Sequence, residues 1–145
     1  MRALKVYLAA PFQWKDEINK RADELRALGI EVTSSWLLEP HKPTTQMHEV
    51  DPKIREQCAI RDVADVSAAD ILVFQPDTTK TIIRAGRHVE FGIAIGIGIS
   101  RPLPIFVVGD DYENIFHHLP QVRHFPSWGH VTTALVSLAQ LKGGV

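Results

Sequence analysis

A single carboxylate, Glu90, stands at the head of an apolar, glycine-spaced run in the segment RAGRHVEFGIAIGIG, residues 84–98. In helical register Glu90 shares a face with Ile93 and Ile97, which places its carboxylate on an apolar stripe. Desolvating a carboxylate costs free energy, and the positive end of the helix dipole offsets part of that cost. Such a carboxylate can act as a nucleophile or stabilise an oxocarbenium ion. A structural glutamate on the rim of a buried helix fits the same pattern equally well.

A second acidic residue, Asp62, lies in a predicted helix beside a stripe made by Ala59, Val63 and Val66. We expect it to point toward the core side near the carboxyl edge of the sheet. Two carboxyl groups that face one pocket suit the roles of nucleophile and acid. A structural role for Asp62 remains open from the pattern alone.

Glycine and arginine flank Glu90 in several places. Gly86 is expected to let the backbone turn tightly into the helix. Arg84 and Arg87 could bind an anion at the helix start, although a solvated cap is the better expectation. The segment lacks the residues of a phosphate-binding loop, and Gly92 and Gly96 lie inside the helix, where they favour close packing over dinucleotide binding.

Other chemically capable residues give weaker signals. The only cysteine, Cys58, is expected to be a small buried helix residue, and no disulfide is possible within the chain. His117 and His118 lack a third ligand at suitable spacing, so we expect a surface pair and no metal site. Phe12 and Trp36 could stack on a flat ligand, although each alone is more often a core residue.

The elements that must position these residues alternate along the chain. Strand patterns occupy residues 4–10, 30–36, 70–76 and 103–109, with a further short strand at 122–125. Helix patterns occupy residues 16–28, 51–69, 86–98 and 131–141, and residues 37–50 form a long loop. Apolar strands that alternate with helices predict one α/β domain, residues 1–145. Its doubly wound, flavodoxin-like sheet has about five mostly parallel strands and helices on both faces.

Composition excludes several classes of function. The 145 residues carry a formal net charge of −1 with acids and bases mixed, which argues against nucleic-acid binding and against a basic membrane patch. The longest apolar run, residues 91–99, is too short to span a bilayer. Residues 1–5 run directly into a strand pattern and do not resemble a signal peptide, so we expect a cytoplasmic protein.

Three segments, in this order, resemble the nucleoside 2-deoxyribosyltransferase family, which includes nucleoside transferases and related deoxynucleotide N-hydrolases. The first is VYLAAPF, residues 6–12, which is similar to the family's first strand and pocket loop. The second is RDVADVSAADILVFQP, residues 61–76, which is similar to its two spaced aspartates and following apolar strand. The third is GRHVEFGIAIGIG, residues 86–98, which resembles the family's glutamate-bearing helix.

The resemblance implies a role for individual residues. Glu90 matches the nucleophile that attacks the sugar C1′, and Asp62 matches an aspartate near the bound nucleoside. Tyr7 matches a tyrosine close to the nucleophile. Pro11 and Phe12 fall in the loop that lines the base.

The chain departs from the family pattern before the glutamate. Where family members usually hold an aspartate or a serine, this chain has Arg84, and Asp77 could supply the missing carboxylate if the loop is shifted. Family members commonly complete each site with a residue from a neighbouring subunit. The implied residue here is Asn114, on the loop after the fourth strand.

These features together predict a nucleoside 2′-deoxyribosyltransferase that acts on nucleosides and free nucleobases without a cofactor. One alternative is a deoxynucleoside 5′-monophosphate N-hydrolase, which the arginines would serve. A second alternative, from another class, is a non-catalytic nucleotide-binding module. The smooth apolar face of Gly92, Ile93, Gly96 and Ile97, taken with the family resemblance, predicts a homo-oligomer, at least a dimer, and the resemblance implies that its active sites are shared.

Overall fold

The computed structural model describes residues 2–40, 47–79, 85–110 and 113–143. These residues form one five-stranded sheet of order β2-β1-β3-β4-β5, in which every neighbouring pair is parallel. The strands are β1 Lys5–Ala9, β2 Glu31–Val32, β3 Ile71–Phe74, β4 Ile105–Val108 and β5 Val122–Phe125. The order confirms the predicted doubly wound, flavodoxin-like fold.

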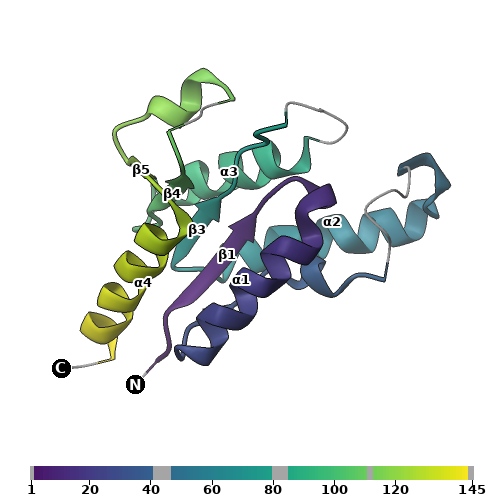
Figure 1. Ribbon diagram of the computed structural model, residues 1–145. Helices are drawn as coiled ribbons and strands as arrows, with labels where there is room; N and C mark the ends of the chain where they lie inside the picture. The colour runs from purple at the N-terminus through teal and green to yellow at the C-terminus, as the bar shows by residue number, and fades with distance from the viewer. Residues whose placement is uncertain (1, 41–46, 80–84, 111–112, 144–145) are drawn as a thin grey trace.

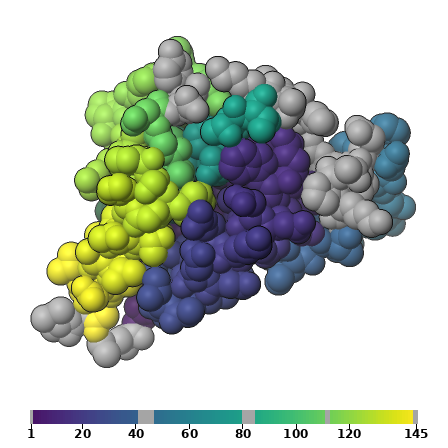
Figure 2. Space-filling model, in the orientation of Figure 1, coloured from purple at the N-terminus to yellow at the C-terminus, as the bar shows by residue number. Residues whose placement is uncertain are grey.

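Helices cover both faces of the sheet. The α-helices are α1 Lys15–Ala27, α2 Pro52–Ser67, α3 Gly86–Ile97 and α4 Trp128–Lys142. Short 3-10 helices are η1 Phe12–Trp14, η2 Ser35–Leu38, η3 Met47–Glu49 and η4 Ile115–His118. Helices α1 and α4 lie on one face, which they largely cover in the space-filling view, and α2 and α3 pack together on the other (Figure 1 and Figure 2). None of the described helices combines the length and apolarity needed to cross a membrane.

Capping residues explain where the helices begin. The Asp51 side chain accepts a hydrogen bond from Lys53 N at 2.8 Å, and Pro52 occupies the first helical position of α2, as predicted. Ser127 caps α4, which therefore begins three residues before the predicted start at 131. Gly29 has a φ of 81° just after α1, a conformation that glycine adopts without a steric penalty.

The second strand is much shorter than the predicted range 30–36. Thr33 N still bonds to Val6 O at 2.8 Å, but the chain then turns into η2. Asp65 of α2 drives this departure, because its carboxylate accepts hydrogen bonds from Ser35 N, at 3.0 Å, and from the Ser35 hydroxyl. The turn carries Trp36 to the carboxyl end of the sheet instead of along its edge.

The buried core consists of the central strands and the helix residues facing them. Every side chain of β3 and β4 is buried, as are Val6, Tyr7 and Leu8 of β1. The strand order changes direction between β1 and β3, the position at which such sheets bind ligands beyond their carboxyl ends. The loops there begin at Ala10 and Gln75.

Candidate active site

Glu90 and Tyr7 meet where α3 packs against β1. Tyr7 lies in the middle of β1, and its side chain is fully buried. Its hydroxyl donates a hydrogen bond to Oε2 of Glu90, the fifth residue of α3. A strand and a helix 83 residues apart in sequence are therefore joined at one carboxylate.

The environment of Glu90 disfavours its charged form. Burial is the main cause that raises the pKa of the Glu90 carboxyl to about 8. The hydrogen bond from Tyr7 and the charge of Arg87 lower this pKa, whereas the nearby carboxyl groups of Asp62 and Asp65 raise it. Burial also raises the pKa of the Tyr7 phenol, so Tyr7 remains a donor. The helix dipole, which we expected to help ionise Glu90, is therefore outweighed by burial. A carboxylate poised in this way gains reactivity when it ionises, because little water is present to stabilise its charge.

Asp62 is the second carboxyl group of the site. Burial raises the pKa of Asp62 to about 6, although Arg61, with Nη2 3.4 Å from Asp62 Oδ1, opposes the rise. The side chain faces a pocket and not the core. The prediction that an apolar stripe of buried residues lies beside Asp62 was only partly right, since Val66 is buried while Ala59 and Val63 are exposed.

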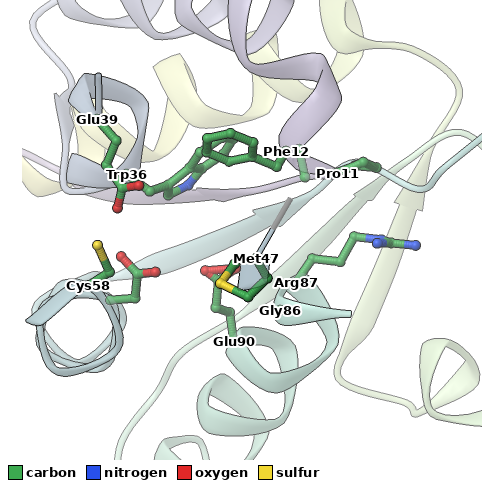
Figure 3. Close-up of a pocket in the computed structure, with 11 residues that line it drawn as sticks. Pro11, Phe12, Trp36, Glu39, Met47, Cys58, Gly86, Arg87 and Glu90 are labelled. Carbon is green, nitrogen blue, oxygen red and sulfur yellow. The ribbon is translucent and has the colours of Figure 1, made fainter. Parts of the chain in front are cut away.

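A pocket with a volume of about 190 Å³ contains both carboxyl groups. One wall is aromatic and consists of Phe12 and Trp36, whose ring centroids are 5.9 Å apart and whose planes are inclined by 42°. Trp36 Nε1 donates a hydrogen bond to Leu8 O at 2.8 Å, which fixes the indole. Glu90 points into the pocket from α3, opposite Phe12 and Trp36 (Figure 3). The lining residues are Ala10, Pro11, Phe12, Trp36, Glu39, Met47, Cys58, Asp62, Gly86, Arg87 and Glu90.

A second cavity of about 260 Å³ continues the first along α2. The residues that line both are Phe12, Glu39, Met47, Cys58 and Asp62. Arg55, which is exposed, lines only the second cavity. The two cavities therefore form one elongated cleft. Glu90 lines only the first cavity, and Arg55 lines only the second.

Glu39, Met47 and Cys58 line the pocket but were not predicted for the site. Glu39 has a side chain 12% exposed and pairs with Arg61. Cys58 is half-buried and contacts Glu39, and burial raises the pKa of its thiol. The expectation of a buried core cysteine was wrong, because this face of α2 is turned toward the pocket. Cys58 and Asp62 are four residues apart on one helix, and this spacing could have indicated that the Cys58 side chain faces the same pocket as Asp62.

Arg87 is not the solvated cap that we expected. It is only 4% exposed and forms an ion pair with Glu113, in which Arg87 Nε donates to Oε1 at 3.1 Å. Its side chain extends away from the pocket centre in Figure 3. Arg84, the other arginine considered for anion binding, lies outside the described residues.

The predicted glycines differ from expectation in their geometry. Gly86 lines the pocket, but among the described glycines only Gly29 and Gly109 have a positive φ. The expected tight turn is therefore not the reason for Gly86. At Gly92 and Gly96 an added Cβ would meet no atom within 4 Å, so these glycines do not serve close packing within the chain.

Asp77 and Asn114 lie outside the pocket lining of their own chain. Asp77 is buried after β3, and its Oδ1 accepts hydrogen bonds from the backbone and hydroxyl of Thr79, at 3.0 and 2.6 Å. Asn114 caps η4, where its Oδ1 accepts a hydrogen bond from Phe116 N at 2.9 Å. Both residues shape the loops at the carboxyl edge.

His117 and His118 do not form the expected surface pair. His117 is fully buried, with its ring centroid 4.7 Å from those of Phe74 and Phe91, whereas His118 is exposed. Burial lowers the pKa of His117 to about 4, so it stays neutral. Within the described ranges no cluster of three histidine, cysteine or acidic side chains is arranged to hold a metal ion.

This arrangement suits cleavage of a bond to a carbon that becomes cationic. Glu90 supplies a partly desolvated carboxylate that can bond to such a carbon, as in retaining glycoside hydrolysis. Asp62 supplies a carboxyl group whose pKa of about 6 suits proton transfer near neutral pH. The aromatic wall can hold a flat leaving group between these acids.

Comparisons with known proteins give a family for the chain and structures that share its fold. The profile of the family described as nucleoside 2-deoxyribosyltransferase matches residues 6–133. A 2-deoxyribosyltransferase from Bacillus psychrosaccharolyticus has a similar structure, with a TM-score of 0.63 and 21% identity over 90% of this chain and 95% of that chain. A CMP N-glycosidase from Clostridium botulinum gives a TM-score of 0.55 and 18% identity over 90% and 97%. At these identities the two structures show a shared fold alone, and no curated protein matches the sequence.

Proposed function

The chain belongs to the nucleoside 2-deoxyribosyltransferase family, an enzyme family, and from this premise we propose that it is a nucleoside 2′-deoxyribosyltransferase. The substrate is a 2′-deoxynucleoside, and the acceptor is a second purine or pyrimidine base. The protein breaks the N-glycosidic bond of the first and forms that of the second. No cofactor takes part.

The reaction has two steps with Glu90 as the nucleophile. In the first, Glu90 bonds to C1′ as the C1′–N bond breaks, and Asp62 gives its proton to the departing base. In the second, a new base attacks C1′ from the side that the first base left. The ester breaks, Asp62 takes a proton from the incoming base, and the β configuration is retained.

The observation that carries this proposal is the placement of Glu90. Its carboxyl group accepts a hydrogen bond from buried Tyr7 and points into a pocket whose opposite wall is Phe12 and Trp36. A base stacked on that wall would leave its sugar over Glu90. A glutamate kept only for stability would gain nothing from a position that raises its pKa to about 8.

The charge of the cleft favours a neutral nucleoside over a nucleotide. Three acidic side chains line it, Glu39, Asp62 and Glu90, and Arg87 is directed toward Glu113. The second candidate, a deoxynucleoside 5′-monophosphate N-hydrolase, is favoured by one observation. Arg55 lines the second cavity and could bind a phosphate there.

We further propose that the active protein is a homo-oligomer, at least a dimer. Gly92 and Gly96 leave open space on α3, and Val89 and Ile99 of the same segment are 63% and 86% exposed. A second copy packed on this face would bury them. Asn114, outside the pocket of its own chain, is the residue we propose to complete the site of a neighbour.

A base-exchange assay tests the function. The protein is incubated with deoxyadenosine and free cytosine, and separately with deoxynucleoside 5′-monophosphates. Formation of deoxycytidine supports the transferase, and release of free base from monophosphates alone supports the hydrolase. Binding of nucleoside with no bond cleavage in either mixture would identify a non-catalytic binding module.

A further inference from the structure

Glu113 joins three segments at the carboxyl edge of the sheet. Its Oε1 accepts hydrogen bonds from Arg87 Nε and from Asp77 N, both at 3.1 Å. Its Oε2 accepts from Arg87 Nη2 and lies 3.3 Å from His88 Nε2. One carboxylate therefore connects the segment after β4, the loop after β3 and the first turn of α3.

The backbone of Glu113 is anchored as well. Glu113 N donates a hydrogen bond to Nδ1 of fully buried His117 at 3.1 Å. His117 is itself fixed against Phe74 and Phe91. The Glu113 carboxylate is thus attached to a rigid part of the core, which lets it act as a fixed point for Arg87.

Arg87 connects Glu113 to the helix that carries the nucleophile. It precedes Glu90 by three residues on α3, so the two share the first turns of one helix. Its side chain is 2% exposed, and a bidentate arginine–carboxylate pair fixes orientation more narrowly than a single hydrogen bond. A buried ion pair is weak as a source of stability, so a positional role is the better explanation for it.

We propose that Glu113 is a positioning residue that, through Arg87, holds the first turn of α3 and the Glu90 carboxylate in the geometry for attack on the sugar, and that balances the Arg87 charge beside that carboxylate. The inference rests on the proposed function for its catalytic consequence. Its electrostatic consequence can be measured without turnover.

The charged and titratable groups around Glu90 determine in which direction each substitution shifts the pKa of its carboxyl group. Tyr7 of β1 and Arg87 of α3 lower the pKa of Glu90, and Asp62 and Asp65 of α2 raise it, all against the larger effect of burial. Removing the Glu113 charge leaves Arg87 without its counter-charge, and Glu90 then ionises at lower pH. Removing the Arg87 charge has the opposite effect.

The test compares Glu113→Gln, Glu113→Asp and Arg87→Met with the unmodified protein. Carbon-13 NMR titration of the Glu90 carboxyl should show its pKa lower by about one unit in Glu113→Gln and higher in Arg87→Met. The lower pKa ionises more of Glu90, so any fall in kcat reports lost positioning and not lost charge. Glu113→Gln should lose between about tenfold and a hundredfold in kcat with little change in KM, and Glu113→Asp should recover part of the loss.

Asp70→Asn is the matched control, because Asp70 also pairs with cations, Arg2 and Lys142, and is similarly exposed (19% against 15%) at the other end of the sheet. It should lower the melting temperature without moving either the titration or kcat. If the pKa of the Glu90 carboxyl were the same in all variants and in the unmodified protein, the inference would be overturned, even if the enzyme were active. If the unmodified protein had no activity, the proposed function would fail while the titration still tested the charge balance.

Discussion

The hydroxyl of Tyr7 donates its hydrogen bond to Glu90 Oε2 from the centre of β1, inside the core. The phenol reaches the carboxylate from below the pocket, so the pocket side of Glu90 stays open to a substrate. Burial keeps the phenol protonated, because it raises the pKa of Tyr7 well above its usual value. The pair therefore fixes both the orientation and the ionisation of the proposed nucleophile.

Tyr7→Phe should weaken catalysis without loss of the fold. The ring stays in place, but the carboxylate loses the hydrogen bond that lowers its pKa. The Glu90 pKa lies above the Asp62 pKa, so it sets the alkaline limb of the kcat/KM profile. That limb should move to higher pH, and the rate at pH 7 should fall about tenfold or more. An unchanged alkaline limb, measured by pH-rate profiles in an intact variant, would contradict a role for Tyr7 at Glu90.

Asp62→Asn should reduce turnover by about a hundredfold or more, because an amide cannot protonate the departing base. Asp62 must be protonated to act as an acid, with a pKa of about 6, and Glu90 must be ionised, with a pKa of about 8. Because the two values cross, the fraction of protein in the active protonation state is small; it rises up to about pH 6, is level to about pH 8 and then falls. The acidic limb of the profile therefore lies near pH 6 and the alkaline limb near pH 8, and both belong to the coupled pair.

Asp62→Asn should also lose the fall in rate at alkaline pH, because that limb of the profile reflects loss of the Asp62 proton. Comparison of pH-rate profiles for the two proteins measures this directly. Near-normal rates of Asp62→Asn on every deoxynucleoside would show that the residue is only structural.

Gly96→Glu should convert an oligomer into a monomer. A Cβ added at Gly96 meets no atom within 4 Å, and Gly96 is exposed, so the fold should survive while a packed second copy is excluded. Light scattering should give a mass near the chain mass of 16.2 kDa for the variant and at least twice that for the unmodified protein. Thr133→Glu, at an exposed position of α4, is the control and should remain oligomeric. A fully active unmodified monomer would rule out the shared site.

Glu90→Gln should stabilise the protein at alkaline pH. In the unfolded chain the carboxyl titrates near the ordinary glutamate pKa of 4.5, whereas the native pKa is about 8. The native state therefore holds an extra proton between these values, and the free energy of unfolding falls as pH rises through that window. Glutamine avoids this loss and still accepts the hydrogen bond from Tyr7.

The gain in melting temperature over the unmodified protein should be larger at pH 9 than at pH 5 by about 3 °C or more. Glu24→Gln, on the exposed surface of α1, should show no such pH dependence. A constant difference for Glu90→Gln across this range would mean that Glu90 titrates normally.

Periodicity in the sequence predicted the elements of the fold better than it predicted side-chain direction. It located every α-helix and strand that the structure describes but none of the short 3-10 helices, and Asp51-Pro52 indicated the start of α2. The end of β2 was wrong because a tertiary hydrogen bond from Ser35 to Asp65 overrides the strand propensity of residues 33–36. No local pattern reports such a contact.

The burial of Arg87 and His117 could not be predicted from spacing either. Arginine and histidine are usually solvated, but Arg87 is buried in an ion pair with Glu113. His117 is buried against Phe74 and Phe91, and its Nδ1 accepts a hydrogen bond from Glu113 N. Glu90 was recognised because a carboxylate in an apolar run is unusual in itself. Glu39 carried no such signal, and Cys58 carried only its four-residue spacing from Asp62, since the place of both at the pocket depends on how α2 packs.

The most direct test of the central claim is to trap the sugar on Glu90. A 2′-fluoro-2′-deoxynucleoside makes the oxocarbenium transition states more costly and should slow hydrolysis and transfer of the ester. Intact-protein mass spectrometry should then show the added mass of one fluorinated deoxyribosyl group, and peptide mapping should place it on Glu90. Glu90→Ala should gain no mass and lose nearly all transfer while it still binds nucleoside. A folded Glu90→Ala variant that exchanges bases at the rate of the unmodified protein would contradict the mechanism.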